Sequence, residues 1–156
     1  MSSPLSRHQP NARRNRTRLQ RMILVDSNIP MYLVGTDHPL KLLSQQLLQR
    51  HVMLGDQLVT DAEVYQEILH RYTAIQRPSA IDDAFAVLSS LAETVFPIEF
   101  SDVERARGIL ASGLQVSARD SLHLAIMEHH GITHILSFDA GLDNYPGIVR
   151  VHELDD

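Results

Sequence analysis

Four acidic residues have types and positions that suit a metal-binding site. Asp26 directly follows the apolar run Met-Ile-Leu-Val, and Asp139 lies just beyond the stretch His-Ile-Leu-Ser. Asp120 lies at the head of an apolar helical stretch, and Glu67 lies further inside another. Carboxylates that lie close together repel one another, and a hard divalent cation such as Mg²⁺ or Mn²⁺ relieves that repulsion. The chemistry of such a site is metal-assisted hydrolysis of a phosphodiester bond.

Each acid also has a simpler explanation when it is taken alone. Asp26 can cap the helix that follows it, and Asp120 fits the last position of a capping box. Glu67 can form a surface ion pair with Arg71, which follows it by four residues. Asp139 stands before Ala-Gly, where an aspartate suits an Asx turn. The prediction of a metal site therefore depends on the four acids meeting at one place.

The hydrophobic pattern of the chain alternates between strand and helix. Strands are expected over residues 22–25, 57–60, 94–98, 133–137 and 147–151. Helices are expected over residues 39–51, 61–75, 79–92, 101–112 and 116–130. This alternation predicts an α/β fold in which a parallel sheet lies between layers of helices. Sites in such folds lie outside the carboxyl ends of the strands, which is where we expect the acids to meet.

Charge divides the chain into two parts. Residues 1–21 contain six arginines and no acid, whereas the rest contains eight Lys or Arg against nineteen Asp or Glu. The basic part has few large aliphatic residues, so we expect a disordered tail over 1–21 and a domain over 22–156 that begins at Met22. An acidic domain repels nucleic acid unless its carboxylates hold cations. The charge therefore neither proves nor excludes a nucleic-acid substrate.

The composition of the chain and the absence of several motifs exclude some classes of protein. The chain of 156 residues has no cysteine, so it has neither a disulfide nor a thiolate metal site. No apolar run is long enough to span a membrane and no secretion signal is present, so we expect a cytoplasmic protein. Asn28 stands where haloacid-dehalogenase phosphatases need a second aspartate, and Lys41, the only lysine, is too early for a phosphoryl-aspartate receiver domain. There is no phosphate-binding glycine loop.

Four sequence blocks, taken in order, carry a resemblance to a known family. They are MILVDSNIPMY, VYQEILHRY, SARDSLHLAIM and SFDAGLDNYPGI, and they resemble the motifs of PIN-domain ribonucleases, specifically VapC-type toxins of type II toxin-antitoxin pairs. The resemblance covers about residues 22–152. It implies a PIN-like three-layer α/β/α sandwich with a parallel sheet of about five strands. It also implies an RNA endonuclease that depends on Mg²⁺ or Mn²⁺, forms a homodimer and is inhibited by a VapB-like antitoxin.

The resemblance assigns the four acids to the site by position. The family's acidic positions fall on Asp26, Glu67, Asp120 and Asp139, with Asp143 as a possible accessory. We expect Asp26 and Asp120 to hold the principal metal ion, Asp139 to complete or support the site, and Glu67 to bind metal or orient water. The arginine-rich tail is not expected from the family.

Nearby polar residues receive smaller roles. Ser137 and Asn28 are expected to donate hydrogen bonds that orient carboxylates. His123 lies one turn from Asp120, and we interpret it as a structural histidine packed or hydrogen-bonded beside the core. Glu63 is explained by its place near a helix N-terminus, where a carboxylate is stabilised. Two alternatives stay open, namely a nuclease of this fold in RNA processing and a catalytically silent binding module.

Overall fold

The computed structural model describes residues 20–154. The expected basic tail lies outside this range except for its last two residues, so its predicted disorder stays a prediction. No helix within residues 20–154 is long and apolar enough to cross a membrane.

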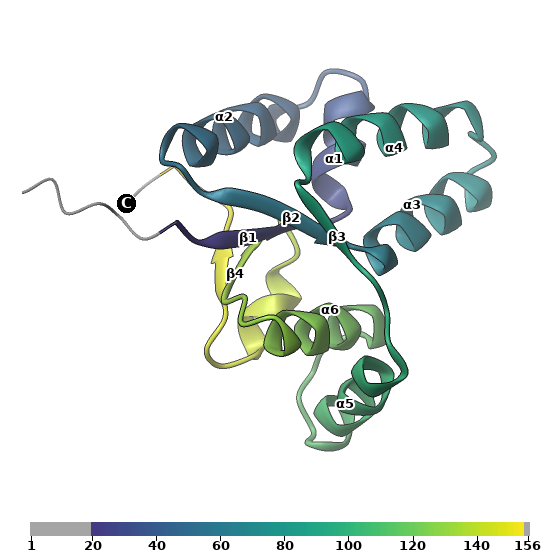
Figure 1. The fold of residues 1–156 in the computed structure, drawn as a ribbon. Coiled ribbons are helices and arrows are strands. Elements are labelled where there is room, and N and C mark those ends of the chain that lie inside the picture. Colours follow the sequence, from purple (N-terminus) through teal and green to yellow (C-terminus); the bar gives the residue numbers. More distant parts are fainter. Residues whose placement is uncertain (1–19, 155–156) are drawn as a thin grey trace, which may run out of the picture.

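A five-stranded parallel sheet forms the centre of the molecule (Figure 1). Its strands are β1 (Met22–Val25), β2 (Gln57–Asp61), β3 (Thr94–Phe96), β4 (His134–Leu136) and β5 (Val149–Val151). They are arranged in the order β3-β2-β1-β4-β5, and all neighbouring pairs are parallel. Ile23 of β1 is in register with Leu58 of β2 and with His134 of β4. Both the number and the direction of the strands confirm the prediction.

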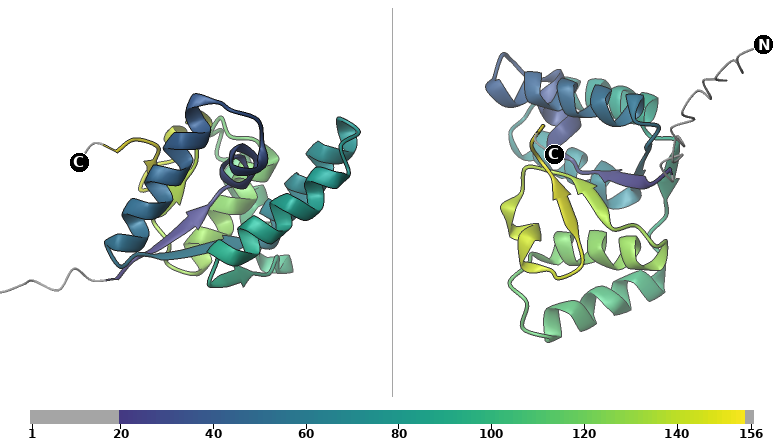
Figure 2. Two further views of the ribbon diagram at one scale, coloured as in Figure 1. Left: turned by 90° about the horizontal axis from the view of Figure 1, so that it is seen from above. Right: turned by 90° about the vertical axis from the view of Figure 1, so that its left-hand side faces the viewer.

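Helices cover both faces of the sheet. They are α1 (Asn28–Val34), α2 (Pro39–Met53), α3 (Ala62–Ala74), α4 (Ser79–Leu91), α5 (Phe100–Ala111) and α6 (Ala118–His129), followed by a short 3-10 helix η1 (Ala140–Asn144). Figures 1 and 2 show α1, α2 and α4 on one side of the sheet and α5 and α6 on the other. The three-layer α/β/α sandwich is thus confirmed.

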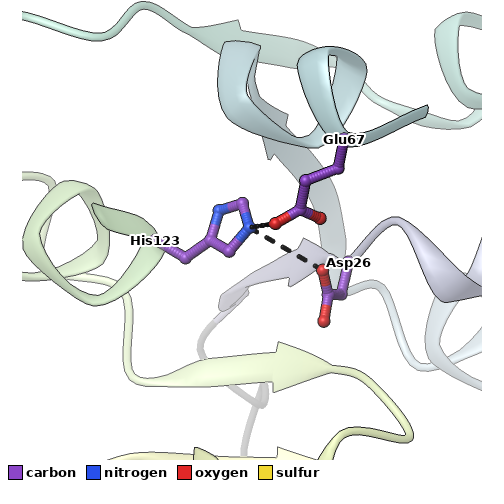
Figure 3. Close-up of side chains that lie close together, drawn as sticks. All are labelled: Asp26, Glu67 and His123. Carbon is purple, nitrogen blue, oxygen red and sulfur yellow. Dashed lines mark hydrogen bonds and ion pairs between the residues drawn. The ribbon is translucent and has the colours of Figure 1, made fainter. Parts of the chain in front are cut away.

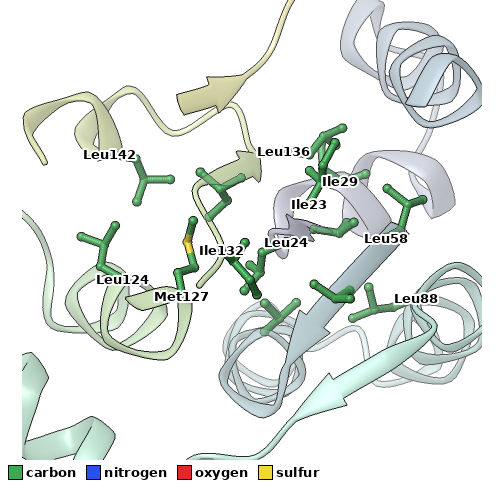
Figure 4. Packing of buried hydrophobic residues seen from close by; sticks show 14 of the residues in the cluster. Ile23, Leu24, Ile29, Leu58, Leu88, Leu124, Met127, Ile132, Leu136 and Leu142 are labelled. Carbon is green, nitrogen blue, oxygen red and sulfur yellow. The ribbon is translucent and has the colours of Figure 1, made fainter. Parts of the chain in front are cut away.

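The continuous apolar run of β1 reflects burial on both faces. Ile23, Leu24 and Val25 are all completely buried, as expected for a central parallel strand covered by helices on each side. Leu124 and Met127 of α6 are also completely buried and belong to the same hydrophobic cluster (Figure 4). This packing holds α6, and with it Asp120, firmly beside the sheet.

Helix α1 and the 3-10 helix η1 were not expected from the sequence, and most element boundaries differ from the sequence-based ranges by one or two residues. Two of these differences have a clear physical reason. Asp61 was expected in a helix, but it is the last residue of β2 and the N-cap of α3, where its Oδ1 accepts a 2.9 Å hydrogen bond from the N–H of Val64. The third strand was expected to reach residue 98, but it ends at Phe96. Pro97 has no N–H to donate to a strand ladder, which explains the early end.

Candidate metal centre

Asp26 lies at the carboxyl end of β1, and its carboxylate accepts three hydrogen bonds, the longest of them from the side-chain amide of Asn28 to Oδ2 at 3.4 Å. The N–H of Ser27 donates to Oδ1 of Asp26 at 2.7 Å, and the hydroxyl of Ser137 donates to its Oδ2 at 2.6 Å. The residue is only 3% exposed, and this burial raises the pKa of Asp26 above its usual value despite the opposing effect of His123. Asp26 is therefore held rigidly in a place where its negative charge is costly without a cation.

Asn28 and Ser137 connect Asp26 to the segment after β4. The side-chain amide of Asn28 donates to Ser137 Oγ at 3.2 Å, and its Oδ1 accepts from the N–H of Phe138 at 3.3 Å. The N–H of Asp139 donates to the same Ser137 Oγ at 3.0 Å. Both side chains make the orienting contacts that were expected of them, and they link two of the four predicted acids.

Asp120 and Asp139 form a second pair of neighbouring acids. Burial of Asp120, its hydrogen bond to Asp139 and the charge of that carboxylate together raise the pKa of Asp120 to about 7. The backbone N–H of Asp120 donates to Ser117 Oγ at 3.0 Å, so the expected helix cap is also present. A Cβ atom at Gly141 would lie 3.1 Å from Asp139 Oδ1 and 3.9 Å from Asp120 Oδ2, and glycine leaves this space open.

Glu67 projects from α3 toward Asp26, and it differs from Glu63 one turn earlier. Glu67 Oε1 lies 3.0 Å from His123 Nε2. Burial alone would raise the pKa of Glu67, but the hydrogen bond and charge of His123 outweigh it and the pKa lies below its usual value. Burial raises the pKa of Glu63, whose Oε1 is 3.9 Å from Arg119 Nε. Within residues 20–154, no ion pair joins Glu67 to Arg71.

His123 of α6 points toward Glu67 and Asp26, as Figure 3 shows. The ring is completely buried, with Nδ1 2.6 Å from Asp61 Oδ2. Its Nε2 lies 3.0 Å from Glu67 Oε1 and 3.8 Å from Asp26 Oδ1. Burial would lower the pKa of His123, but the charge and hydrogen bond of Asp61, with help from Glu67 and Asp26, raise it well above the usual value. One ligand atom each from Asp26, Glu67 and His123 lie within 4.8 Å of one another.

Sequence reasoning missed two members of this cluster. His123 was interpreted as structural; it is buried and hydrogen-bonded, but its partners are acids of the site. Asp61 was not considered at all, although it stands at the end of β2 much as Asp26 follows β1. Two features of the sequence could have identified these residues. Asp61 ends a strand as Asp26 follows one, and His123 lies one helical turn after Asp120.

Two other acidic groups lie outside this cluster. Asp143 forms a bidentate ion pair with Arg150, with oxygen–nitrogen distances of 2.8 and 2.9 Å, and its side chain is 54% exposed. Glu99, Asp102 and His129 form a second group on α5 and α6. There, Asp102 accepts a hydrogen bond from the N–H of Glu99 in a capping box and contacts His129 Nδ1 at 3.0 Å. Helix capping accounts for that group.

The structure thus brings the four predicted acids to one edge of the sheet. Asp26 contacts Ser137, which also binds the backbone of Asp139. Asp139 and Asp120 both approach Gly141, and the nitrogen Nε2 of His123 lies near both Glu67 and Asp26. The carboxyl ends of β1, β2 and β4 all contribute, as expected for a site in a parallel α/β fold.

The fold and the site agree with comparisons to known proteins. The PIN domain family matches residues 23–148. Ribonuclease VapC13 of Mycobacterium tuberculosis is 57% identical over 130 residues, which cover 83% of this chain and 99% of that protein. Ribonuclease VapC23 of the same species is 41% identical over 118 residues, which cover 76% of this chain and 93% of that protein. The chain therefore belongs to the PIN-domain family, in its group of VapC ribonucleases.

Solved structures show the same fold at low sequence identity. The crystal structure of Mycobacterium tuberculosis VapC20, a toxin that cleaves the sarcin-ricin loop, aligns with a TM-score of 0.68 at 20% identity and covers 84% of this chain and 99% of that one. VapBC2 of Rickettsia felis, solved with a promoter DNA fragment, aligns with a TM-score of 0.61 at 12% identity, covering 83% of this chain and 97% of that one. The predicted family and fold are confirmed.

Proposed function

We propose that this protein is a metal-dependent endoribonuclease that acts as the toxin of a toxin-antitoxin pair. The observation that carries the proposal is the convergence of Asp26, Glu67, Asp120 and Asp139 at one edge of the sheet. The VapC ribonucleases that match nearly their whole length to this chain support RNA as the substrate.

The donor set of the site fits a hard divalent cation. Asp26, Asp120, Asp139 and Glu67 offer carboxylate oxygens, which Mg²⁺ and Mn²⁺ prefer. Asp120 does not ionise easily without a counter-charge, because its burial and the neighbouring carboxylate of Asp139 raise the pKa of Asp120 to about 7. A cation bound there would polarise the scissile phosphate and lower the pKa of a bound water. We assign Mg²⁺ or Mn²⁺ to these four residues.

The side chains of the site have different roles in hydrolysis. Asp26 and Asp120 come from rigid elements, so they fix the place at which the phosphate is hydrolysed. Glu67, whose pKa is lowered, stays ionised and accepts a hydrogen bond from the attacking water, which orients it in line with the leaving 3′ oxygen. Ser137 holds Asp26 and the backbone of Asp139 in a common orientation. Such cleavage yields a product with a 5′ phosphate.

A pocket of about 390 Å³ lies between α1 and α3, and we propose that RNA binds in it beside the acids. It is lined by Asn28, Met31, Tyr32, Arg71, Tyr72 and Ile75. Arg71 lies one helical turn beyond Glu67, and Tyr32 lies one turn beyond Asn28. Since no acid forms an ion pair with Arg71 in the described part of the chain, its guanidinium suits a phosphate. The tyrosine ring suits a stacked base.

The family also supports protein partners. Structural relatives include a toxin-antitoxin complex from Klebsiella pneumoniae, aligned at a TM-score of 0.59 and 17% identity. We therefore propose that a VapB-like antitoxin inhibits this protein, that it forms a homodimer, and that it acts in the cytoplasm. The RNA-processing nuclease and the silent binding module receive no support from a particular feature of the structure.

The proposal is tested by induced expression with and without the neighbouring antitoxin gene, followed by mapping of cleaved RNA ends. Purified protein should cleave RNA only when Mg²⁺ or Mn²⁺ is present. Replacing Asp26 or Asp120 with Asn should abolish cleavage while the fold is kept, as judged by circular dichroism. Full cleavage by both variants, or cleavage in excess chelator, would refute the metal site.

A further inference from the structure

The imidazole of His123 lies among carboxylates of the proposed metal site, with Nε2 directed at Glu67 and Asp26 (Figure 3). Its other nitrogen, Nδ1, faces Asp61. Its Nε2 faces Glu67 and Asp26, two of the four acids assigned to the metal. From this arrangement we infer that His123 Nε2 is itself a metal ligand, and that Asp61 is the residue that positions it. The inference rests on the proposed function and adds an imidazole to a site otherwise made of carboxylates.

Asp61 fixes the tautomer and direction of the ring. Its Oδ2 lies 2.6 Å from His123 Nδ1, while its Oδ1 accepts the N–H of Val64 at 2.9 Å. Both Asp61 and His123 are completely buried, so neither side chain has room to turn. Because the carboxylate keeps a proton on Nδ1, the lone pair for a cation is on Nε2. Histidine ligands in metalloproteins are held in this way by a carboxylate on the other nitrogen.

The distances around Nε2 fit shared coordination. Bonds from Mg²⁺ or a first-row cation to nitrogen or oxygen ligands are about 2.1 Å long. Two ligand atoms on one ion therefore lie about 3.0 Å apart at a right angle and at most about 4.2 Å apart. Nε2 is 3.0 Å from Glu67 Oε1 and 3.8 Å from Asp26 Oδ1, so both pairs fall within these limits. Binding of the ion replaces the Nε2 proton, which passes to solvent.

An imidazole ligand changes which ion the site prefers. Mg²⁺ favours oxygen ligands, whereas nitrogen ligands favour transition metals in the order Mn²⁺, Co²⁺ and Ni²⁺. A site with His123 should therefore bind Mn²⁺ and Co²⁺ more tightly than Mg²⁺. Replacing His123 with Gln should reduce this preference, because an amide oxygen takes the place of the nitrogen.

The direct test is electron spin-echo spectroscopy of Mn²⁺ bound to the full chain, prepared with ¹⁵N-labelled histidine. We expect the spectrum to contain the coupling of a coordinated histidine nitrogen. His129→Gln is the matched control, because His129 belongs to the second acidic group on α5 and α6. The coupling should persist in His129→Gln and disappear in His123→Gln.

Calorimetric titrations with Mg²⁺ and Mn²⁺ supply a second measurement. His123→Gln should weaken Mn²⁺ binding by about tenfold or more and leave Mg²⁺ binding nearly unchanged. Asp61→Asn keeps a side chain that can cap α3 but removes the charge behind the ring, so it should weaken Mn²⁺ binding by roughly 10- to 100-fold. Unchanged Mn²⁺ affinity in both variants would overturn the assignment.

The outcomes separate this inference from the proposed function. If Asp120→Asn abolishes Mn²⁺ binding but the wild-type spectrum lacks a histidine nitrogen, the metal site stands and the role of His123 is wrong. The wild-type measurement needs no substitution, so it decides the question even if His123→Gln fails to fold. Loss of the coupling in His129→Gln would place the ion in the other group and would also overturn the inference. If the wild-type protein binds neither ion, the proposed function itself fails.

Discussion

The hydroxyl of Ser137, just after β4, donates a 2.6 Å hydrogen bond to Oδ2 of Asp26, just after β1. Ser137 Oγ also accepts the backbone N–H of Asp139 at 3.0 Å. One buried hydroxyl therefore sets the relative position of two acids that are far apart in the sequence. It also stabilises the charge on Asp26, which burial would otherwise oppose.

Replacing Ser137 with Ala should weaken both folding and metal binding. The loss of a hydrogen bond to a buried carboxylate should lower the free energy of unfolding by roughly 1.5–3 kcal/mol, measured by urea denaturation near neutral pH. Mn²⁺ affinity should fall by about tenfold or more. Ser90→Ala is the control, because that exposed hydroxyl donates to the carbonyl of Val87 within α4. Equal effects of the two substitutions would contradict the role of Ser137.

Replacing Asp120 with Asn should stabilise the metal-free protein at alkaline pH. The folded-state pKa of Asp120 is raised to about 7, above the value of 3.8 for an unperturbed group. Its contribution to stability is therefore fully present below the unfolded pKa and is lost as pH rises through the folded pKa. Thermal unfolding in chelator should show the variant more stable than wild type at about pH 8 and similar near about pH 4. A constant difference at both pH values would contradict the raised pKa.

Substitutions at Glu67 and Glu63 should have different effects although both residues lie on α3. Glu67 approaches Asp26 and His123, whereas the only acid–base contact of Glu63 in the described residues is with Arg119 at 3.9 Å. Glu67→Gln should lose most of the cleavage rate and weaken Mn²⁺ binding, and Glu63→Gln should change both little. The measurement is the RNA cleavage rate of both variants at saturating and at limiting Mn²⁺. Equal losses, or a larger loss from Glu63→Gln, would refute the assignment of Glu67.

Replacing Arg71 with Ala should weaken RNA binding without changing metal binding. Its guanidinium lines the pocket between α1 and α3 and lies one turn beyond Glu67, where it suits a phosphate of the bound RNA. We expect KM for a short RNA to rise several-fold and to depend less on salt, while kcat stays within about twofold. Arg107→Ala on α5 is the control. An equal rise in KM for both variants would indicate a general charge effect instead.

A chain that begins at Met22 should fold and cleave RNA. The described sheet starts at Met22, and Ile23, Leu24 and Val25 that follow are completely buried. Removal of residues 1–21 takes away the contacts of Arg21 with His134 and Asp56 but leaves every buried strand in place. The thermal unfolding temperature should therefore stay within a few degrees of that of the full chain. Unfolding of the shortened chain, or loss of its toxicity, would place the tail within the domain.

Much of the architecture could be predicted because its signals are local. The apolar run of β1 is continuous because central parallel strands are buried on both faces. The alternation of strand and helix predicted the parallel sheet, and the resemblance of four sequence blocks to a family predicted the order of the acids. A boundary was predicted wrongly where one residue belongs to two elements, as Asp61 does at the end of β2 and at the N-cap of α3.

What the sequence by itself determined is the order of the elements and the acids that follow them. Only the tertiary structure decided which partner each acid has. The spacing of Glu67 and Arg71 on one helix is also suited to an ion pair, but the packing of α6 beside the sheet brings His123 Nε2 within 3.0 Å of Glu67 Oε1 instead. Asp61 meets His123 across 62 positions of sequence, a contact that no local pattern encodes. Such contacts follow from burial, because a buried charge without a partner costs free energy and the fold determines which partner is within reach.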